Sequence, residues 1–138
     1  MTLTPNQRSE YRELKDYSVE ISKHNHTEHN SGSETITHGV AKHLVGMVGV
    51  RNGYRVSSEV EVKGGDIDMV LWGNPERLTY AVECETGLTE ETKQSKIDRY
   101  VMQTPIDDIV FVECNRLPMD MVECYEFIAS ELGLQDCT

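Results

Sequence analysis

Long hydrophobic runs are absent from this sequence, and so is any paired-cysteine motif. The longest apolar run is far shorter than the ~20 residues of a membrane-spanning helix, and the start, MTLTPNQRSE, does not have the shape of a signal peptide. We therefore expect a soluble, cytoplasmic protein without a membrane partner. The four cysteines (Cys84, Cys114, Cys124 and Cys137) form no CxxC pair and are most simply free thiols. The sequence also has no internal repeat, glycine-rich phosphate loop or Ser/His/Asp order.

Lysine is scarce, and acidic residues outnumber basic ones. The chain has 24 Asp and Glu against 13 Lys and Arg, and its net charge is −11. This balance opposes electrostatic attraction to phosphates, so it is the main argument against a nucleic-acid enzyme. An acid excess with little lysine also resembles the proteins of salt-accumulating, halophilic archaea, in which salt shortens the Debye length to about 3 Å. In such a source the acidity would say little about the substrate.

Four carboxylates lie on the two strands predicted in the stretch GGDIDMVLWGNPERLTYAVECE, residues 64–85. Side chains alternate between the two faces of a strand, so Asp66 and Asp68 are predicted to point to one side of the first strand. The same alternation places Glu83 and Glu85 together on the second strand. This stretch is therefore the first candidate for a functional site.

The loop between these two strands, NPER, predicts their register. Asn74 and Pro75 suit the first two positions of a type I turn in a four-residue hairpin loop, which places Asp68 across from Glu83. Because facing carboxylates repel one another, a chain that keeps them opposed usually neutralises them with a divalent cation. The alternative is a solvated hairpin face in a very acidic protein.

A helix is predicted from Thr4 to about Lys23, with Thr4 as its N-cap. Its apolar stripe of Tyr11, Leu14 and Ile21 is thin, so the helix needs a partner surface to stay folded. That surface belongs either to its own domain or to a second subunit.

We divide the chain into residues 1–33, a helix and a polar linker, and residues 34–138, a single α/β domain of ordinary size. The linker contains His24, His26 and His29, which match no strong zinc signature. A solvated loop is therefore favoured over a metal site.

The first core helix is predicted over residues 34–51, because apolar residues recur there at helical spacing. His38 and Lys42 lie one turn apart on its less apolar side, where they approach a phosphate or, as we expect, face solvent. In the strand that follows, Glu59 and Glu61 share a face, and either is a candidate for one more metal ligand.

The C-terminal half predicts two further helices and one strand. Thr89 suits the N-cap of a helix, and the apolar run IDDIVFVEC, residues 106–114, predicts a central strand covered on both faces. A last helix is predicted to open at Pro118, with an apolar stripe made of Met121, Val122, Tyr125, Ile128, Ala129 and Leu132. Together the elements predict an α/β fold with a mixed sheet of about four strands flanked by helices. The helical crossover makes the strand at 109–113 parallel to the strand that carries Glu83.

This order of elements resembles the PD-(D/E)xK nuclease superfamily, in particular the cores of archaeal Holliday-junction resolvases and type IV restriction endonucleases. The resemblance spans roughly His38 to Asn115. Asp68 and Glu83 match the Asp and Glu that bind magnesium in such nucleases, whereas Glu85 stands where the family has Lys.

The resemblance implies a restriction-endonuclease-like core and a nuclease that depends on Mg²⁺ or Mn²⁺ and acts on DNA. Asp68, Glu83 and Glu85 would then be metal ligands, and Lys93 or Lys96 from the following helix would supply the missing cation. The alternative is a catalytically inactive binding or assembly module with the same fold. Similar nucleases commonly act in pairs, so a homodimer that uses the N-terminal helix is also expected.

Overall fold

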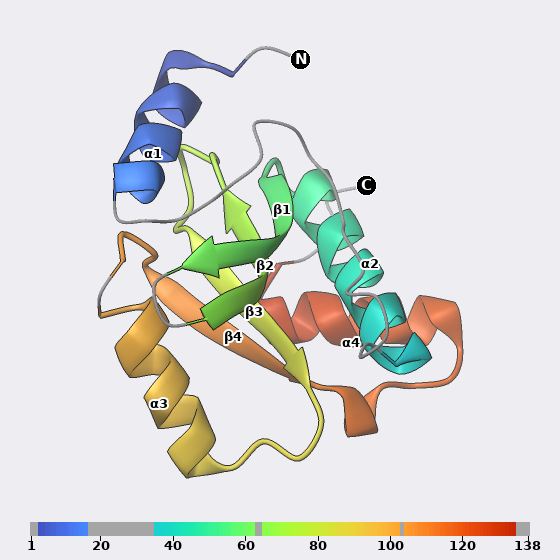
Figure 1. The fold of residues 1–138 in the computed structure, drawn as a ribbon. Helices are drawn as coiled ribbons and strands as arrows, with labels where there is room; N and C mark the ends of the chain where they lie inside the picture. Colours follow the sequence, from blue (N-terminus) through green and yellow to red (C-terminus); the bar gives the residue numbers. More distant parts are fainter. Residues whose placement is uncertain (1–2, 17–34, 63–64, 103, 135–138) are drawn as a thin grey trace.

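The computed structural model describes residues 3–16, 35–62, 65–102 and 104–134 of the chain. Four α-helices, four strands and one short 3₁₀-helix form in these ranges (Figure 1). In chain order they are α1 (Pro5–Asp16), α2 (Ile36–Arg51), β1 (Arg55–Val62), β2 (Gly65–Trp72), β3 (Tyr80–Glu85), α3 (Glu90–Tyr100), β4 (Asp108–Glu113), η1 (Cys114–Arg116) and α4 (Met121–Leu132). No helix within these ranges is long and apolar enough to cross a membrane.

The four strands form one mixed sheet in the order β1-β2-β3-β4. Neighbours are antiparallel except β3 and β4, which are parallel, as the sequence predicts. The predicted central position of the 106–114 strand is wrong, because β4 is an edge strand. The apolar run of β4 arises because α3 and α4 contact the two faces of this strand. Such a run indicates that both faces are covered, but it does not indicate how many strands pair with β4.

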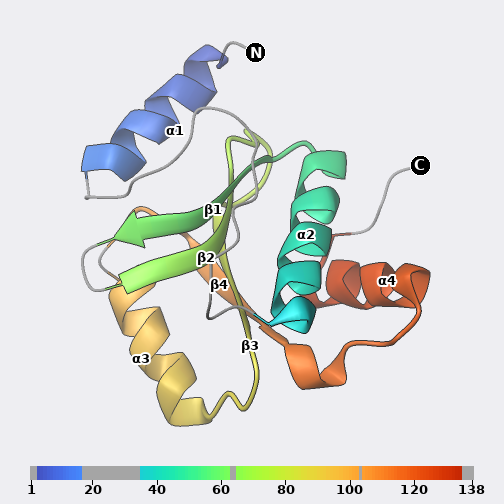
Figure 2. The ribbon, with the colours of Figure 1, turned by 45° about the vertical axis from the view of Figure 1, so that its right-hand side comes forward.

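Helices cover both faces of the sheet (Figures 1 and 2). On one face α2 and α4 pack over a core that includes Leu44, Leu71 and Ile128. On the other face α1 and α3 pack over a second core, which includes Leu14, Trp72 and Tyr100. The layer order is thus helix, sheet, helix, which buries both sides of the sheet.

Helix α1 starts with a reciprocal cap. The Gln7 backbone N–H donates to the Thr4 hydroxyl oxygen at 3.2 Å, and the Thr4 N–H donates to the Gln7 side-chain oxygen at 3.0 Å. Leu14 is fully buried in the core of the same chain, and the Tyr11 ring lies 5.9 Å from that of Trp72. The partner surface that α1 needs is therefore supplied by its own sheet. The predicted end of this helix at Lys23 and the linker histidines lie outside the described residues.

The loop between β2 and β3 contains the predicted turn but is longer than four residues. The Arg77 N–H donates to the Asn74 carbonyl oxygen at 3.3 Å, and the Glu76 N–H donates to the Asn74 side chain at 2.9 Å. Strand β2 ends at Trp72 and β3 begins at Tyr80, so the whole connection spans residues 73–79.

Helix α4 starts later than predicted, at Met121, because Asp120 is the N-cap. Met121 and Val122 are 54% and 65% exposed, so their predicted place in the buried stripe is wrong, and Cys124 packs in the core instead. The thiols of Cys84, Cys114 and Cys124 are free, as predicted, and all three are buried, while Cys137 lies outside the described residues. Gly133 ends the helix in the left-handed conformation, with φ of +68°.

Candidate metal centre

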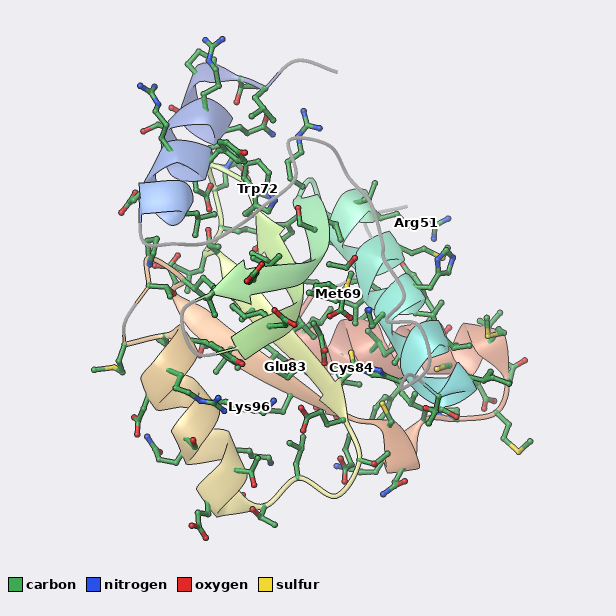
Figure 3. All side chains as sticks on the ribbon, viewed as in Figure 1. Arg51, Met69, Trp72, Glu83, Cys84 and Lys96 are labelled. Carbon is green, nitrogen blue, oxygen red and sulfur yellow. The ribbon has the colours of Figure 1, made fainter. Side chains whose placement is uncertain are left out.

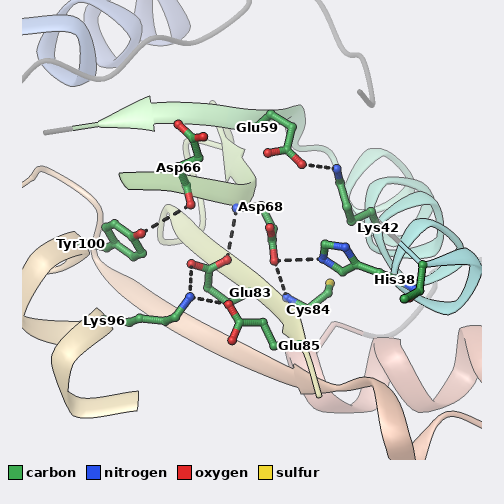
Figure 4. A network of polar contacts seen from close by, with 11 residues as sticks. His38, Lys42, Glu59, Asp66, Asp68, Glu83, Cys84, Glu85, Lys96 and Tyr100 are labelled. Atoms are coloured by element: carbon green, nitrogen blue, oxygen red, sulfur yellow. Dashed lines mark hydrogen bonds and ion pairs between the residues drawn. The ribbon is translucent and has the colours of Figure 1, made fainter. Parts of the chain in front are cut away.

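The ladder between β2 and β3 opens where the predicted carboxylates face one another. Met69 and Val82 form the last Cα pair, so Asp68 and Glu83 come next in the same register. Here side chains replace backbone carbonyls: the Asp68 N–H donates to Glu83 Oε2 at 3.2 Å, and the Cys84 N–H donates to Asp68 Oδ2 at 2.8 Å (Figure 4). Each carboxylate is thereby fixed by the neighbouring strand.

Three carboxylates form a cluster at this opening, which we call the acidic triad: Asp68, Glu83 and Glu85. One oxygen atom from each lies within 4.8 Å of the others, so the triad can hold a metal ion. The Glu83 side chain is the most buried of the three, at 1% exposure. Figure 3 shows that Glu83 points toward the α3 side of the sheet, whereas Cys84 points toward α2 and α4.

Of the two predicted lysines, the structure brings Lys96 to the triad and leaves Lys93 away from it. Lys96 Nζ donates to Glu83 Oε1 at 3.1 Å and to Glu85 Oε1 at 2.5 Å. Lys93 Nζ instead lies 3.8 Å from Glu90 Oε1, one turn away on the same helix. Helix α3 begins at its predicted N-cap Thr89, whose hydroxyl accepts the Thr92 N–H at 3.2 Å.

Two residues of α2 face the sheet rather than solvent, so that prediction is wrong. His38 Nε2 lies 3.3 Å from Asp68 Oδ2, and the Lys42 side chain is completely buried. A signal for this exists in the sequence, because Lys42, Gly46 and Gly49 recur at helical spacing. A Cβ at Gly49 would lie 2.7 Å from a Leu71 methyl carbon, so small residues mark the side of α2 that contacts the sheet.

The other predicted acids lie outside the triad. Glu59 forms an ion pair with Lys42 at 2.5 Å, and Glu61 is exposed. Asp66 is also exposed, and its carboxylate points away from that of Asp68 (Figure 4). The strict alternation that predicts Asp66 and Asp68 on one side fails because the β1–β2 hairpin bends at Asp68, where Met69 and Ile67 pack in different cores.

Burial and crowding of like charges control protonation in the triad. Burial raises the pKa of Glu83, and the nearby charge of Asp68 raises it further, while Lys96 acts in the opposite direction. Burial disfavours the charged amine of Lys96, but hydrogen bonds and attraction to Glu85 and Glu83 outweigh this, so its pKa is raised. Burial also raises the pKa of Cys84 well above its usual value, which keeps it a thiol and argues against a nucleophile.

A cavity of about 270 Å³ opens beside the triad, between α2 and the end of β3. Its lining includes His38, Glu85 and Thr86. Glu85 belongs to the triad and His38 contacts Asp68, so a ligand in the cavity would lie next to the triad.

No family model, curated protein or solved structure matches this chain. Geometry and chemistry at the open end of the β2–β3 hairpin therefore provide the argument about function.

Proposed function

We propose that this protein is a nuclease that uses Mg²⁺ or Mn²⁺ to cleave phosphodiester bonds in DNA. The observation that carries the proposal is the acidic triad with a lysine from a separate helix in contact with two of its members. Asp68, Glu83 and Glu85 would hold the cation, and Lys96 would take the place of the lysine that the PD-(D/E)xK pattern has at position 85. The restriction-endonuclease-like core and the DNA substrate belong to this same proposal.

The donor set fits a hard divalent cation. All three ligand groups are carboxylates, which suit Mg²⁺ and Mn²⁺ better than softer metals. The network also carries more acid than base, because Asp68 and the three glutamates at 59, 83 and 85 face two lysines, Lys42 and Lys96. With all six groups ionised, the formal excess of two negative charges equals the charge of one such ion. When bound, the ion would lower the pKa of a water ligand and stabilise charge on the phosphate.

The protein's own residues orient the reactants. The Asp68 carboxylate is fixed through Oδ2, which accepts from the Cys84 N–H and lies 3.3 Å from His38 Nε2. Lys96 supplies a positive charge that can contact a water molecule or a phosphate oxygen next to Glu85. Glu83, whose pKa is raised by burial between strand and helix, would act as a ligand in its charged form, with its proton passing to solvent.

Cleavage assays test the proposal. Purified protein in high-salt buffer should cut plasmid or branched DNA when Mg²⁺ or Mn²⁺ is added, and Asp68→Ala should abolish cutting. Lys96→Met should lose most of the activity while Lys93→Met, a matched variant on the same helix, should keep it. Cutting that survives in Asp68→Ala would contradict the proposal.

A second candidate function is a binding or assembly module that has the fold without the chemistry. Two observations favour it: Glu85 stands in place of the family lysine, and the net charge of −11 opposes DNA binding. Calorimetry separates the two candidates. A live site should bind Mn²⁺ in a way that Asp68→Ala abolishes, whereas the module should show no binding at this site.

A homodimer is part of the proposal for the active form. Pairing would place two centres on one duplex, as in nucleases that cut both strands. Light scattering at high salt tests this, because a mass near the 15.7 kDa of one chain would contradict dimerisation. Since Leu14 of α1 is already buried within its own chain, deletion of α1 would test folding and dimerisation together, and a Tyr11→Ala variant is the milder probe.

A further inference from the structure

The β1–β2 hairpin has an irregular point where Glu59 lies across from Asp68. The strands keep one register on both sides of this point, but these two residues do not form a Cα pair. Glu59 has φ of +50°, and among the described residues it is the one non-glycine residue with a positive φ. A left-handed glutamate costs about 1 kcal/mol or more, so surrounding contacts must hold it there.

The hairpin changes direction at this point. On the near side, Val56 and Leu71 pack in the core beneath α2. On the far side, Val60 and Ile67 pack in the other core, with α1 and α3, although Val56 and Val60 have the even spacing that normally places side chains on one face. Figures 1 and 2 show the end of β1 and the start of β2 turned toward the α3 side of the sheet. Asp68 lies at the bend.

A buried ion pair holds this bend. Lys42 Nζ lies 2.5 Å from Glu59 Oε1, with the lysine side chain 0% exposed and the glutamate side chain 15% exposed. Lys42 extends from the middle of α2, which is capped by Thr35 and packed closely on the sheet at Gly49. A charge taken fully out of water is stable only when it is paired, so the position of Lys42 strongly restricts that of Glu59.

We propose that Lys42 is a positioning residue: its ion pair with Glu59 fixes the hairpin bend and thereby holds the Asp68 carboxylate in the acidic triad. The effect of Lys42 on cation affinity rests on the proposed function. Its effect on the position of Asp68 can be tested without a metal. Loss of the pair lets Glu59 relax toward ordinary strand geometry, and Asp68 then shifts away from the Cys84 N–H and Glu83. Lys42 itself contacts neither substrate nor cation in this scheme.

Hydrogen exchange of the metal-free protein tests the structural part. The Cys84 amide donates to Asp68 Oδ2, so its exchange reports whether Asp68 stays in place. We expect roughly 10-fold faster exchange at Cys84 in Lys42→Met, and rates close to the wild type in the control Lys93→Met. The double variant Lys42→Met/Glu59→Gly should exchange more slowly than Lys42→Met, because glycine accepts the positive φ without a pair to hold it.

Mn²⁺ titration of the same variants tests the functional part. Lys42→Met should bind Mn²⁺ about 10-fold more weakly, the usual effect of removing a group that supports a metal ligand, and the glycine double variant should recover part of the affinity. Wild-type protein that binds no Mn²⁺ would refute the metal site, while the exchange data would still decide the role of Lys42.

The inference is overturned if Lys42→Met leaves Cys84 exchange unchanged, or if the glycine double variant exchanges as fast as the single variant. If Lys42→Met does not fold, the comparison moves to Lys42→Met/Glu59→Gly against Lys42→Met/Glu59→Ala. Slower Cys84 exchange in the glycine variant supports the inference, and equal exchange refutes it.

Discussion

The two ends of the β2–β3 hairpin satisfy their polar groups in opposite ways. At the loop end, Glu10 of α1 binds both ends of the connection at residues 73–79. The Gly73 N–H donates to one Glu10 oxygen at 2.8 Å, and the Thr79 hydroxyl donates to the other. Gln7 donates to the Gly73 carbonyl oxygen at 3.2 Å. This half-buried acid thus receives its hydrogen bonds from neutral donors.

At the open end, the acids of the triad lie next to one another instead. Lys96 is shared between Glu83 and Glu85, and Asp68 accepts from a backbone N–H beside His38. Burial raises the pKa of Glu10 as well as that of Glu83, so a perturbed acid alone does not mark a functional site. The feature that distinguishes the open end is that three carboxylates lie close together there. Among the described residues, Lys96 forms ion pairs with two of them.

The largest effect on stability is expected at the loop end, from Leu14→Ala. Leu14 is fully buried in the core shared with Trp72, so truncation removes apolar contacts and leaves a cavity. We expect a loss of about 2–5 kcal/mol in the free energy of unfolding, measured by urea denaturation. Mn²⁺ affinity of the folded variant should not change. A fall in affinity without a fall in stability would mean that the two ends are not independent.

At the open end, Glu83→Gln is expected to lower Mn²⁺ affinity without lowering stability. The amide removes the buried charge that a cation needs but keeps the shape of the side chain, so Mn²⁺ affinity should fall by more than the roughly 10–100-fold typical of an outer-shell change. Isothermal titration calorimetry measures this. The unfolding free energy near pH 7 should stay equal or rise, because the buried acid no longer has to be kept protonated.

The polar residues at the open end could be predicted from the sequence, because the pairing of two consecutive strands depends on local geometry. The turn at Asn74 and the alternation in β3 are enough to bring Asp68 and Glu83 together, and the cap at Thr89 aligns a helix whose Lys96 reaches them. Short-range geometry thus predicts most of the triad.

Contacts that depend on packing between distant elements could not be predicted in this way. His38 and Lys42 look like the polar side of a helix, and the glycines that share the Lys42 side give only a weak signal that this side contacts the sheet. The bend at Glu59 leaves no compositional mark, since a glutamate at positive φ follows from its partner and not from its own preference. Likewise, the edge position of β4 depends on the whole sheet.

A smaller effect is expected from Thr79→Val, which removes the hydroxyl that donates to Glu10 but keeps the side-chain shape. Glu10 still accepts from the Gly73 N–H, so the cost should be about 1 kcal/mol in unfolding free energy. The measurement is urea denaturation beside Thr104→Val, whose hydroxyl bonds the Tyr100 carbonyl oxygen elsewhere in the fold. Unchanged Mn²⁺ affinity in Thr79→Val would support the separation of the two ends, and weakened affinity would break it.

Both ends should also share a pH dependence of stability, which is spread over several pH units. The pKa values of Glu83 and Glu10 are raised above the usual 4.5, that of Glu83 to about 9, so the folded state binds more protons than the unfolded state between these values. The metal-free protein should therefore lose stability as pH rises from about 5 to 8, by at most about 1.4 kcal/mol per pH unit through Glu83, and Glu10 should add to this loss between pH 4.5 and its own raised pKa.

The variant Glu83→Gln should flatten this slope in part, and Glu10→Gln/Glu83→Gln should remove most of it. In the presence of Mn²⁺ the contribution of Glu83 should reverse, because the cation replaces its proton and the stabilisation by Mn²⁺ then grows with pH. Urea denaturation at several pH values, with and without Mn²⁺, measures all three slopes. A wild-type slope that persists in Glu83→Gln would show that the carboxyl at the open end is ionised in the folded protein, and that Lys96 alone is enough to keep it so.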